Sequence, residues 1–502
     1  MKRIVLLLWC LVAVGQLTAQ QGLEPRKSYL VTDVNEKSLT SVLKVCQKGG
    51  IEYLLVRSPF LTYGHYRWNP DFARDDKAVA RMVREAEDAG VHLGLLIQPD
   101  AISENDLFFS AKNSKSFLRE GRVELFSDIT DDDVDIALLY NGVIKGISSM
   151  NLILIEDELI SYGTIERAGE LLLLHHCTRG VCGTRRSSHS TVAEVYKIWD
   201  SPDRFVAPEG CLRDSVRQWL NHRIEASGVT FVLRAGEPGQ ELIDGSIRVR
   251  QVERWAADGD LESLGWINLH AADKKRQATS IDDVEWVLSK AVAFNAGYGV
   301  LADPKTMKEH GRMDEILEKI RQWDTIRYAG SLTPEHREAM RDPYSDWHLE
   351  RDEDGEFELS QRHFSRRYQC RFVEADSLLI GAEPWEWKAD SEGRFGLRIQ
   401  VNGKVTIKDP MVNTEKGLVM FPCVIEPGQC LVYDFDEMAC VMDANGHTIK
   451  EMAVEGVSLL PSGTSEVRLY CETEKEGAWP EVTVRYVTSS LIGRIGVENY
   501  HK

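Results

Sequence analysis

The chain has 502 residues, 43% of them hydrophobic, and a formal net charge of −19. This length predicts two or three domains, and the apolar content excludes a largely disordered chain. The acidic balance argues against a nucleic-acid partner, which would require a basic face.

The N-terminus has the pattern of a secretory signal. Lys2 and Arg3 precede the apolar stretch from Ile4 to Val14, and the small residue Ala19 stands before a polar segment. A membrane span would need about 20 apolar residues, and no later segment has them. We therefore predict a signal peptide at residues 1–20, a secreted or periplasmic protein, and no membrane span.

The cysteines after the signal are odd in number and scattered, so they do not form a disulfide framework. We expect most of them to be small core residues, and one or two disulfides remain open. The histidines and cysteines of residues 175–189 fit no standard zinc spacing, and the chain has no phosphate-binding or dinucleotide-binding motif. The sequence therefore predicts neither a metal nor a cofactor.

In residues 21–110, strands alternate with helices. The strand-like runs are Tyr29 to Asp33, Ile51 to Val56 and Val91 to Ile97. Segments with helical spacing separate them, from Glu36 to Cys46 and from Asp75 to Ala89. This alternation predicts βαβ units and a parallel sheet.

The pattern changes in residues 111–200, which are rich in strands and poor in helices. Val134 to Tyr140 and Val143 to Ile147 flank Asn141-Gly142, a strong short hairpin signal. We predict a small antiparallel β-domain inserted at 111–200.

The βα pattern resumes in residues 201–345. Val229 to Pro238 begins with a β-branched and aromatic run that predicts a buried parallel strand, and it leaves Arg234 and Glu237 at the strand's carboxyl end. Further strand candidates end at His270 and Asp303. The barrel strands number six or seven rather than a clear eight.

The helices stop near residue 345, and strand-like runs alternate with turns from there on. The predicted fold is therefore α/β, a (β/α)8-type barrel with an irregular strand count, an inserted β-domain and a C-terminal antiparallel β-sandwich at 350–502.

A family resemblance rests on the first three strands. The first ends in Asp33, the second leads into Tyr63-Gly64-His65-Tyr66, and an Ala-Gly-Val-His-Leu-Gly-Leu segment enters the third. This resembles the front half of glycoside-hydrolase-type (β/α) barrels of polysaccharide-degrading bacteria, and the C-terminal sandwich resembles the accessory domain that often follows them. The chain departs from that pattern at Arg234, where such barrels place an aspartate.

The inserted segment carries a resemblance of its own. Ile155 to Tyr162, Cys177-Thr-Arg-Gly180, Gly183-Thr184 and His189 are similar to a small β-module of bacterial barrel proteins and phage tail hub proteins. This likeness implies a structural or glycan-contacting module.

Glycoside hydrolysis needs two carboxyl groups that flank the scissile bond. The acids at predicted strand ends are Asp33, Asp100, Glu237 and Asp303. We predict Glu237 as the general acid/base, with Asp303 or Asp100 as its partner. The alternative is that these acids cap helices or pair with arginines.

Other residues suit sugar binding, because aromatic rings stack on sugar faces and arginines clamp acidic groups. The candidates are Asp33, Arg57, His65, Arg67, Trp68, Arg234, Trp266 and His270. The alternatives are an ordinary aromatic loop, a buried core tryptophan, and a salt bridge between Arg234 and Glu237.

These observations predict an exported glycoside hydrolase-like protein that acts on a polysaccharide or oligosaccharide, including acidic glycans, without a cofactor. Two alternatives stay open. One is a non-catalytic carbohydrate-binding protein, and the other is a polysaccharide lyase in which Arg234 neutralises a uronate and a histidine or tyrosine abstracts the proton.

Overall fold

The computed structural model describes residues 26–147, 150–201, 204–206, 211–259, 261–274, 276–352, 355–376, 378–389, 392–435, 437–474 and 479–496. The predicted signal peptide lies outside these residues. The described chain divides into two compact units. The first holds Asp33–Thr40 and Leu55–Ala235, and the second holds Glu24–Thr32, Ser41–Leu54 and Gly236–Lys502.

Six strands form the parallel sheet, in the order β16-β5-β2-β1-β18-β17. They are β1 (Ser28–Thr32), β2 (Tyr53–Val56), β5 (His92–Ile97), β16 (Phe231–Arg234), β17 (Ser263–Asn268) and β18 (Gly297–Leu301). The register is parallel between β16 and β5 in the first unit, and between β18 and both β1 and β17 in the second. A parallel α/β sheet is therefore present, and closure into an eight-stranded barrel stays a prediction.

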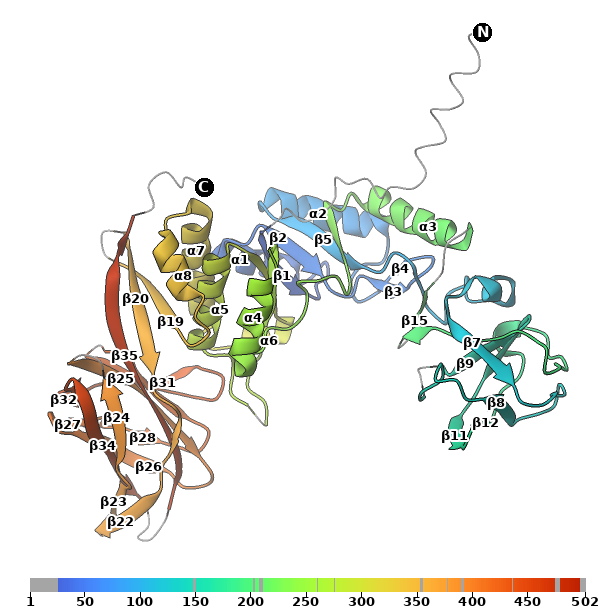
Figure 1. Ribbon diagram of the computed structural model, residues 1–502. Coiled ribbons are helices and arrows are strands. Elements are labelled where there is room, and N and C mark those ends of the chain that lie inside the picture. Colours follow the sequence, from blue (N-terminus) through green and yellow to red (C-terminus); the bar gives the residue numbers. More distant parts are fainter. Residues whose placement is uncertain are drawn as a thin grey trace. The chain divides into compact units, whose positions relative to one another are not determined.

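Helices alternate with these strands. They are α1 (Leu39–Gly49), α2 (Asp76–Asp88), α3 (Cys211–Ser227), α4 (Arg248–Ala257), α5 (Ile281–Phe294), α6 (Pro304–Glu309), α7 (Met313–Ala329) and α8 (Pro334–Met340). In the first unit α2 and α3 pack side by side (Figure 1). Among the helices of the described residues, none is both long and apolar enough to cross a membrane.

An antiparallel sheet in the first unit has the order β10-β9-β13-β7-β8-β12-β11 (Figure 1). Its strands are β7 (Arg119–Leu125), β8 (Ile136–Leu139), β9 (Leu152–Ile155), β10 (Glu158–Ser161), β11 (Thr164–Ala168), β12 (Leu171–His175) and β13 (Val195–Ile198). A separate apolar core, which includes Val123, Leu138 and Val195, lies within it.

The predicted hairpin at Asn141-Gly142 is wrong. Strand β8 pairs with β7 and β12, and residues 143–147 form no strand. The Asn141 side chain accepts a hydrogen bond from Val143 N and donates one to the carbonyl of Arg122, so the dipeptide makes a local turn. Asn-Gly specifies the turn alone, whereas strand pairing depends on which edge of the sheet is available.

Short strands connect these parts of the first unit. They are β3 (Phe60–Thr62), β4 (Arg67–Trp68), β6 (Ala101–Ile102), β14 (Asp200–Ser201) and β15 (Arg204–Val206). Strand β3 pairs with β4, and β15 pairs with both β6 and β14.

Two antiparallel sheets form the C-terminal part of the second unit. The first contains β19 (Asp346–Arg351), β20 (Phe357–Phe364), β21 (Tyr368–Gln369), β25 (Gly393–Asn402), β29 (Cys430–Tyr433), β30 (Met438–Met442), β31 (Thr448–Ala453), β33 (Leu459–Leu460) and β35 (Glu481–Ile495). The second contains β22 (Phe372–Asp376), β23 (Leu379–Ala382), β24 (Trp385–Ala389), β26 (Ile407–Thr414), β27 (Gly417–Met420), β28 (Val424–Ile425), β32 (Glu455–Gly456) and β34 (Gly463–Thr473).

The two sheets share one core, in which Leu397 and Tyr486 of the first sheet join Val412 and Leu469 of the second. Alternate residues of the strands point into this core, as the buried positions along β34 show. The described cysteines, Cys46, Cys177, Cys182, Cys370, Cys423, Cys430, Cys440 and Cys471, are all free.

Candidate functional site

The loop after β2 is the most tightly constrained segment among the predicted site residues. Tyr63 exchanges two hydrogen bonds with Ser103, whose hydroxyl accepts from Tyr63 N at 2.8 Å and whose N–H donates to Tyr63 O at 3.1 Å. The Tyr66 hydroxyl donates to the carbonyl oxygen of Gln98 at 2.6 Å. The loop is therefore fixed to the segment that follows β5, and its side chains are held in place.

Asp106 is one of the residues of this site that the sequence did not reveal. Its side chain is 1% exposed. Its carboxylate accepts hydrogen bonds from the His65 backbone N–H at 3.0 Å and from Phe108 N–H at 3.0 Å, and it lies 2.7 Å from Nδ1 of His65. A buried carboxylate needs such partners to offset its lost hydration. No motif marks Asp106, because it lies 41 residues from His65 along the chain.

His65 is half-buried between two aromatic rings from other segments. Its ring stacks on Phe108, with centroids 4.2 Å apart and planes 14° apart, and lies 5.0 Å from the ring of Trp219 on α3. Trp219 is itself 39% exposed. Aromatic faces beside a polar ring nitrogen form the kind of surface that binds a sugar, which has apolar faces and polar edges.

Asp100, which follows β5, lies between two arginines of α3. Arg213 and Arg217 each donate two hydrogen bonds to its carboxylate, with distances from 2.8 to 3.3 Å. Burial raises the pKa of Asp100. The two arginines together lower this pKa by a larger amount, so the net shift is downward. A carboxyl group with this environment stays ionised, which suits a structural or electrostatic role better than that of a general acid.

Tyr66 connects the loop to this arginine group. Burial is the main reason that its pKa lies well above the usual value, and the charge of Asp100 raises it further, whereas Arg217 lowers it. Asp100, Arg217, Tyr66 and Asp106 therefore belong to one electrostatic neighbourhood.

The remaining predicted residues of the first unit have mixed environments. Asp33 and Arg57 form an ion pair at 2.5 Å, and both are partly exposed. Arg67 and Arg234 are exposed. The Trp68 ring is 7% exposed, stacks on Phe60 and donates to Asp76 at 2.6 Å. It therefore packs inside the loop and offers a bound sugar no open face.

In the second unit, the predicted site residues have different structural roles. Asp303 is the N-cap of α6 and accepts a hydrogen bond from Thr306 N at 2.7 Å. Trp266 is 8% exposed and donates to the Tyr29 hydroxyl at 2.8 Å, so it is a core residue. Nδ1 of His270 lies 3.2 Å from the carbonyl of Ala271. Glu237 is exposed in the loop after β16.

These contacts match the structural alternatives for Asp100, Asp303 and Trp266, namely arginine pairing, helix capping and core packing. The structure brings Asp33 together with Arg57. It also gathers His65 with Asp106, Phe108 and Trp219, of which only His65 was a predicted site residue. The catalytic roles of Glu237, Asp303 and Asp100 stay predictions.

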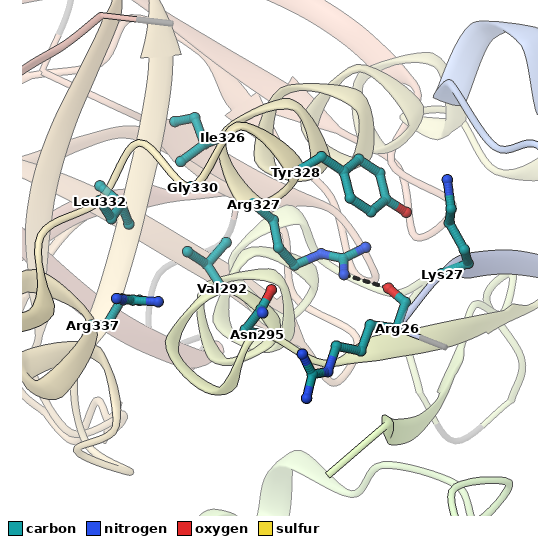
Figure 2. Close-up of a pocket in the computed structure, with 10 residues that line it drawn as sticks. All are labelled: Arg26, Lys27, Val292, Asn295, Ile326, Arg327, Tyr328, Gly330, Leu332 and Arg337. Carbon is teal, nitrogen blue, oxygen red and sulfur yellow. Dashed lines mark hydrogen bonds between the residues drawn. The ribbon is translucent and has the colours of Figure 1, made fainter. Parts of the chain in front are cut away.

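A cavity of about 290 Å³ lies elsewhere in the second unit, and four cationic side chains line it, from Arg26, Lys27, Arg327 and Arg337 (Figure 2). Arg327 donates to the backbone oxygen of Arg26 and to Ser28 and Asp324. Lys27 pairs with Glu52 at 3.1 Å. The C-cap residues of α5 and α7, Asn295 and Gly330, also line this cavity, and helix C-termini favour cations. The charges of Arg327 and Lys27 thus have structural partners, and we assign no ligand to this cavity.

The inserted sheet contains a buried ionic cluster that accounts for its sequence signature. Arg179 donates two hydrogen bonds to Glu158, at 2.9 and 2.8 Å, and Nε2 of His189 lies 2.9 Å from the same carboxylate. The Thr184 hydroxyl accepts from Leu159 N at 3.0 Å. The signature residues therefore hold this module together. Within the described residues no group of histidine, cysteine and acidic side chains could hold a metal ion.

No protein-family model matches the sequence, and no curated protein does. Solved glycoside hydrolases align over most of the chain. The isomalto-dextranase of Arthrobacter globiformis T6 shares 9% identity over 93% of this chain and 96% of its own, with a TM-score of 0.26.

The maltogenic α-amylase AmyB of Thermotoga neapolitana shares 10% identity over 93% of this chain and 99% of its own, with a TM-score of 0.32. The α-galactosidase AgaB of Geobacillus stearothermophilus shares 11% over 90% of this chain and 55% of its own, with a TM-score of 0.30. At these scores the likeness does not identify the reaction, which must be argued from the site.

Proposed function

We propose that this chain is an exported glycoside hydrolase-like protein that acts on a polysaccharide or oligosaccharide. The observation that supports a glycan ligand best is the aromatic surface of His65, Phe108 and Trp219 in the first unit. His65 comes after β2 and Phe108 comes after β5, and α/β proteins bind their ligands at the carboxyl ends of such strands. Charged groups of opposite sign, Asp100 with Arg217, lie in the same neighbourhood and can bind hydroxyl or acidic substituents.

Hydrolysis itself is proposed for Glu237 as general acid/base, with Asp303 or Asp100 as its partner. Glu237 is exposed after a parallel strand and so is accessible to a substrate. The lowered pKa of Asp100 fits an ionised partner rather than an acid.

The test is a screen of the mature protein against neutral and acidic glycans, in which new reducing ends are measured. We expect Glu237→Gln to lower turnover by about 100-fold or more, as removal of an acid/base group does. Glu253→Gln is the matched control, because Glu253 is exposed on α4. Full activity of Glu237→Gln would remove Glu237 from the mechanism. If the protein binds a glycan but cleaves none of those tested, the result would favour the non-catalytic alternative.

A polysaccharide lyase is the second candidate, and the contact between His65 and Asp106 favours it. Elimination on a uronate needs a base and a positive group beside the carboxylate, but no pair of catalytic carboxylic acids. Its products absorb in the ultraviolet, which separates them from hydrolysis products in the same screen.

A further inference from the structure

A second cavity of the second unit, of about 380 Å³, differs from the first in its balance of charges. Residues of α1, α6 and α7 line it, together with His447 of the turn between β30 and β31. Its lining includes three lysines and one aspartate, namely Lys44, Lys48, Lys308 and Asp314. Lys48 pairs with Asp314 at 2.6 Å. Two lysine charges therefore remain in this cavity, although the whole chain has a formal net charge of −19.

Lys44 and Lys308 carry the two remaining charges. Within the described residues, neither ammonium group has a hydrogen-bond or ion-pair partner. The acids that adjoin the lining residues in sequence are already paired with other cations, Glu309 with Lys305 and Glu315 with Arg312. Both lysines are exposed. Their charges are therefore available to an anion from solution.

Hydrogen bonds and close packing hold the walls of this cavity in place. The Gly311 N–H donates to the carbonyl of Asn445 at 2.9 Å, and a Cβ atom on Gly311 would lie 2.4 Å from the backbone nitrogen of His447. His310 is 4% exposed, and its Nε2 donates to the carbonyl of Thr279 at 2.9 Å, while its Nδ1 accepts from a backbone N–H at 3.2 Å. Burial also lowers the pKa of His310, so the ring is neutral. The charge of the cavity therefore comes from the lysines.

Apolar side chains form another part of the lining. They are Val45, Met307, Met313 and Leu317. Val45 and Met307 are half-buried, so part of their surface is accessible. A sugar ring packs its C–H faces on such surfaces, and a uronate or a sulfated sugar adds an anionic group at the edge of the ring. Apolar contact together with unpaired ammonium groups therefore suits an anionic sugar better than a bare inorganic anion, which would gain nothing from the apolar lining.

We propose that this cavity binds the anionic sugars of an acidic polysaccharide, and that Lys44 and Lys308 bind their charged groups. This inference rests on the proposed glycan function and assigns uronate-containing or sulfated polysaccharides as the substrate class. Both kinds of sugar present an anionic group on a sugar ring, which an ammonium group binds through its charge and its hydrogen bonds. No bond is made or broken at this site, so the hydrolysis assigned to Glu237 does not depend on these lysines.

The experiment measures the binding of short oligosaccharides to the full mature protein by calorimetry. Oligogalacturonates carry carboxylates, carrageenan oligosaccharides carry sulfates, and malto-oligosaccharides of equal length carry no charge. Inorganic phosphate serves as the bare anion. The variants are Lys44→Ala and Lys308→Ala, singly and combined, and the charge-conserving pair of Lys44→Arg with Lys308→Arg. Lys404→Ala is the matched control, because Lys404 is exposed in the same unit and does not line the cavity. Reducing ends are measured in the same samples.

We expect at least one acidic oligosaccharide to bind, and the combined alanine variant to weaken its affinity by about 10- to 100-fold. The combined arginine variant should stay within about threefold of the wild type, because it keeps both charges. High salt should weaken binding by the wild type far more than binding by the combined alanine variant. The bound sugar should also slow the acylation of Lys44 and Lys308, but not of Lys404, as measured by mass spectrometry. This protection locates the ligand even where another site binds the same sugar.

The outcomes separate this site from the proposed function. Unchanged affinity in the combined alanine variant, with no protection of Lys44 and Lys308, overturns the site, and reducing ends released by the wild type would still support the hydrolase. Neutral oligosaccharides or phosphate that bind as tightly as the acidic sugars overturn the assignment of anionic sugars. Lysine-dependent binding of an acidic sugar without any cleavage keeps the site and removes the hydrolysis. If the wild type neither binds nor cleaves any glycan, both proposals fail.

Discussion

Gly64 shows how a single residue permits the contact between His65 and Asp106. A Cβ atom at this position would lie 2.6 Å from Oδ1 of Asp106 and 2.8 Å from its Cγ, which is too close for real atoms. The φ of +111° adds strain for any L-residue. The glycine therefore lets a buried carboxylate approach the loop backbone.

We expect Gly64→Ala to lower the free energy of unfolding by about 2–3 kcal/mol, because strain and a clash act together. Urea denaturation measures this change. Gly142→Ala is the control, since Gly142 also has positive φ but nothing lies within 4 Å of its Cβ position. It should cost about 1 kcal/mol. Equal losses in both variants would show that contact with Asp106 contributes nothing.

A second residue-scale prediction concerns the buried pair of Arg179 and Glu158, whose side chains are 2% and 0% exposed. Arg179→Met leaves a buried carboxylate without its main partner, so we expect a loss of about 3–5 kcal/mol in the stability of the inserted module. Denaturant unfolding followed by fluorescence measures it. Arg167→Met, at an exposed position of β11, is the control.

The same pair makes the module sensitive to acid. Burial raises the pKa of Glu158, but hydrogen bonds from Arg179 and His189 lower it below the usual 4.5. The stabilisation is therefore complete above pH 4.5 and is lost as the pH falls through the lowered value. An Arg179→Met variant whose acid sensitivity equals that of the wild type would contradict this assignment.

At the scale of elements, charged groups join α5 to the first strands of the sandwich within the second unit. Glu285 of α5 accepts from Trp323 at 3.1 Å and from Leu349 N at 3.2 Å, and it lies 2.7 Å from Nδ1 of His348. At the start of α5, Asp282 pairs with Arg362 at 3.3 Å. The helix is thus anchored to the sandwich by side chains that neither element could satisfy alone.

The charged groups of this junction predict a pH range in which the second unit is most stable. Burial lowers the pKa of His348, but the charge of Glu285 and the hydrogen bonds to Glu285 and Glu350 together raise it, so the pKa lies above 6.5. The hydrogen bond from His348 is the main cause that lowers the pKa of Glu350 to about 2. The contribution of His348 to stability is complete below pH 6.5 and is lost as the pH rises through the raised pKa of His348. The Glu350 contribution is complete above pH 4.5 and is lost toward pH 2.

We therefore expect the second unit to be most stable between about pH 4.5 and 6.5. His348→Gln should flatten the alkaline side of the profile, and thermal unfolding at a series of pH values measures it. His363→Gln, in the neighbouring strand β20, is the control. An unchanged alkaline slope in His348→Gln would show that the histidine stays neutral.

At the scale of the whole molecule, local patterns predicted the elements better than their partners. Val91 to Ile97 and Ile281 to Asn295 match β5 and α5 closely, because apolar periodicity and caps such as Ser280 act within a few residues. The hairpin at Asn141-Gly142 failed, because strand pairing is a property of the assembled sheet. Domain boundaries at 111–200 and 350–502 stay predictions.

The candidate site likewise contains some residues that the sequence could indicate and others that it could not. His65 and Asp100 could be proposed from the sequence, because each follows a predicted strand. Asp106, Phe108 and Trp219 could not, since only the folded chain brings them to His65. The acids Asp100 and Asp303 also show the limit of strand-end reasoning, because one pairs with arginines and the other caps a helix.

The sequence by itself determined which residues form strands and helices, the alternation that gives a parallel sheet, and the glycines that allow sharp turns. These follow from backbone sterics and local apolar periodicity. The tertiary structure alone decided which strand-end acids have structural partners and which groups the histidine ring nitrogens contact. Those outcomes depend on contacts between residues far apart in the chain, where burial and distance set the electrostatics.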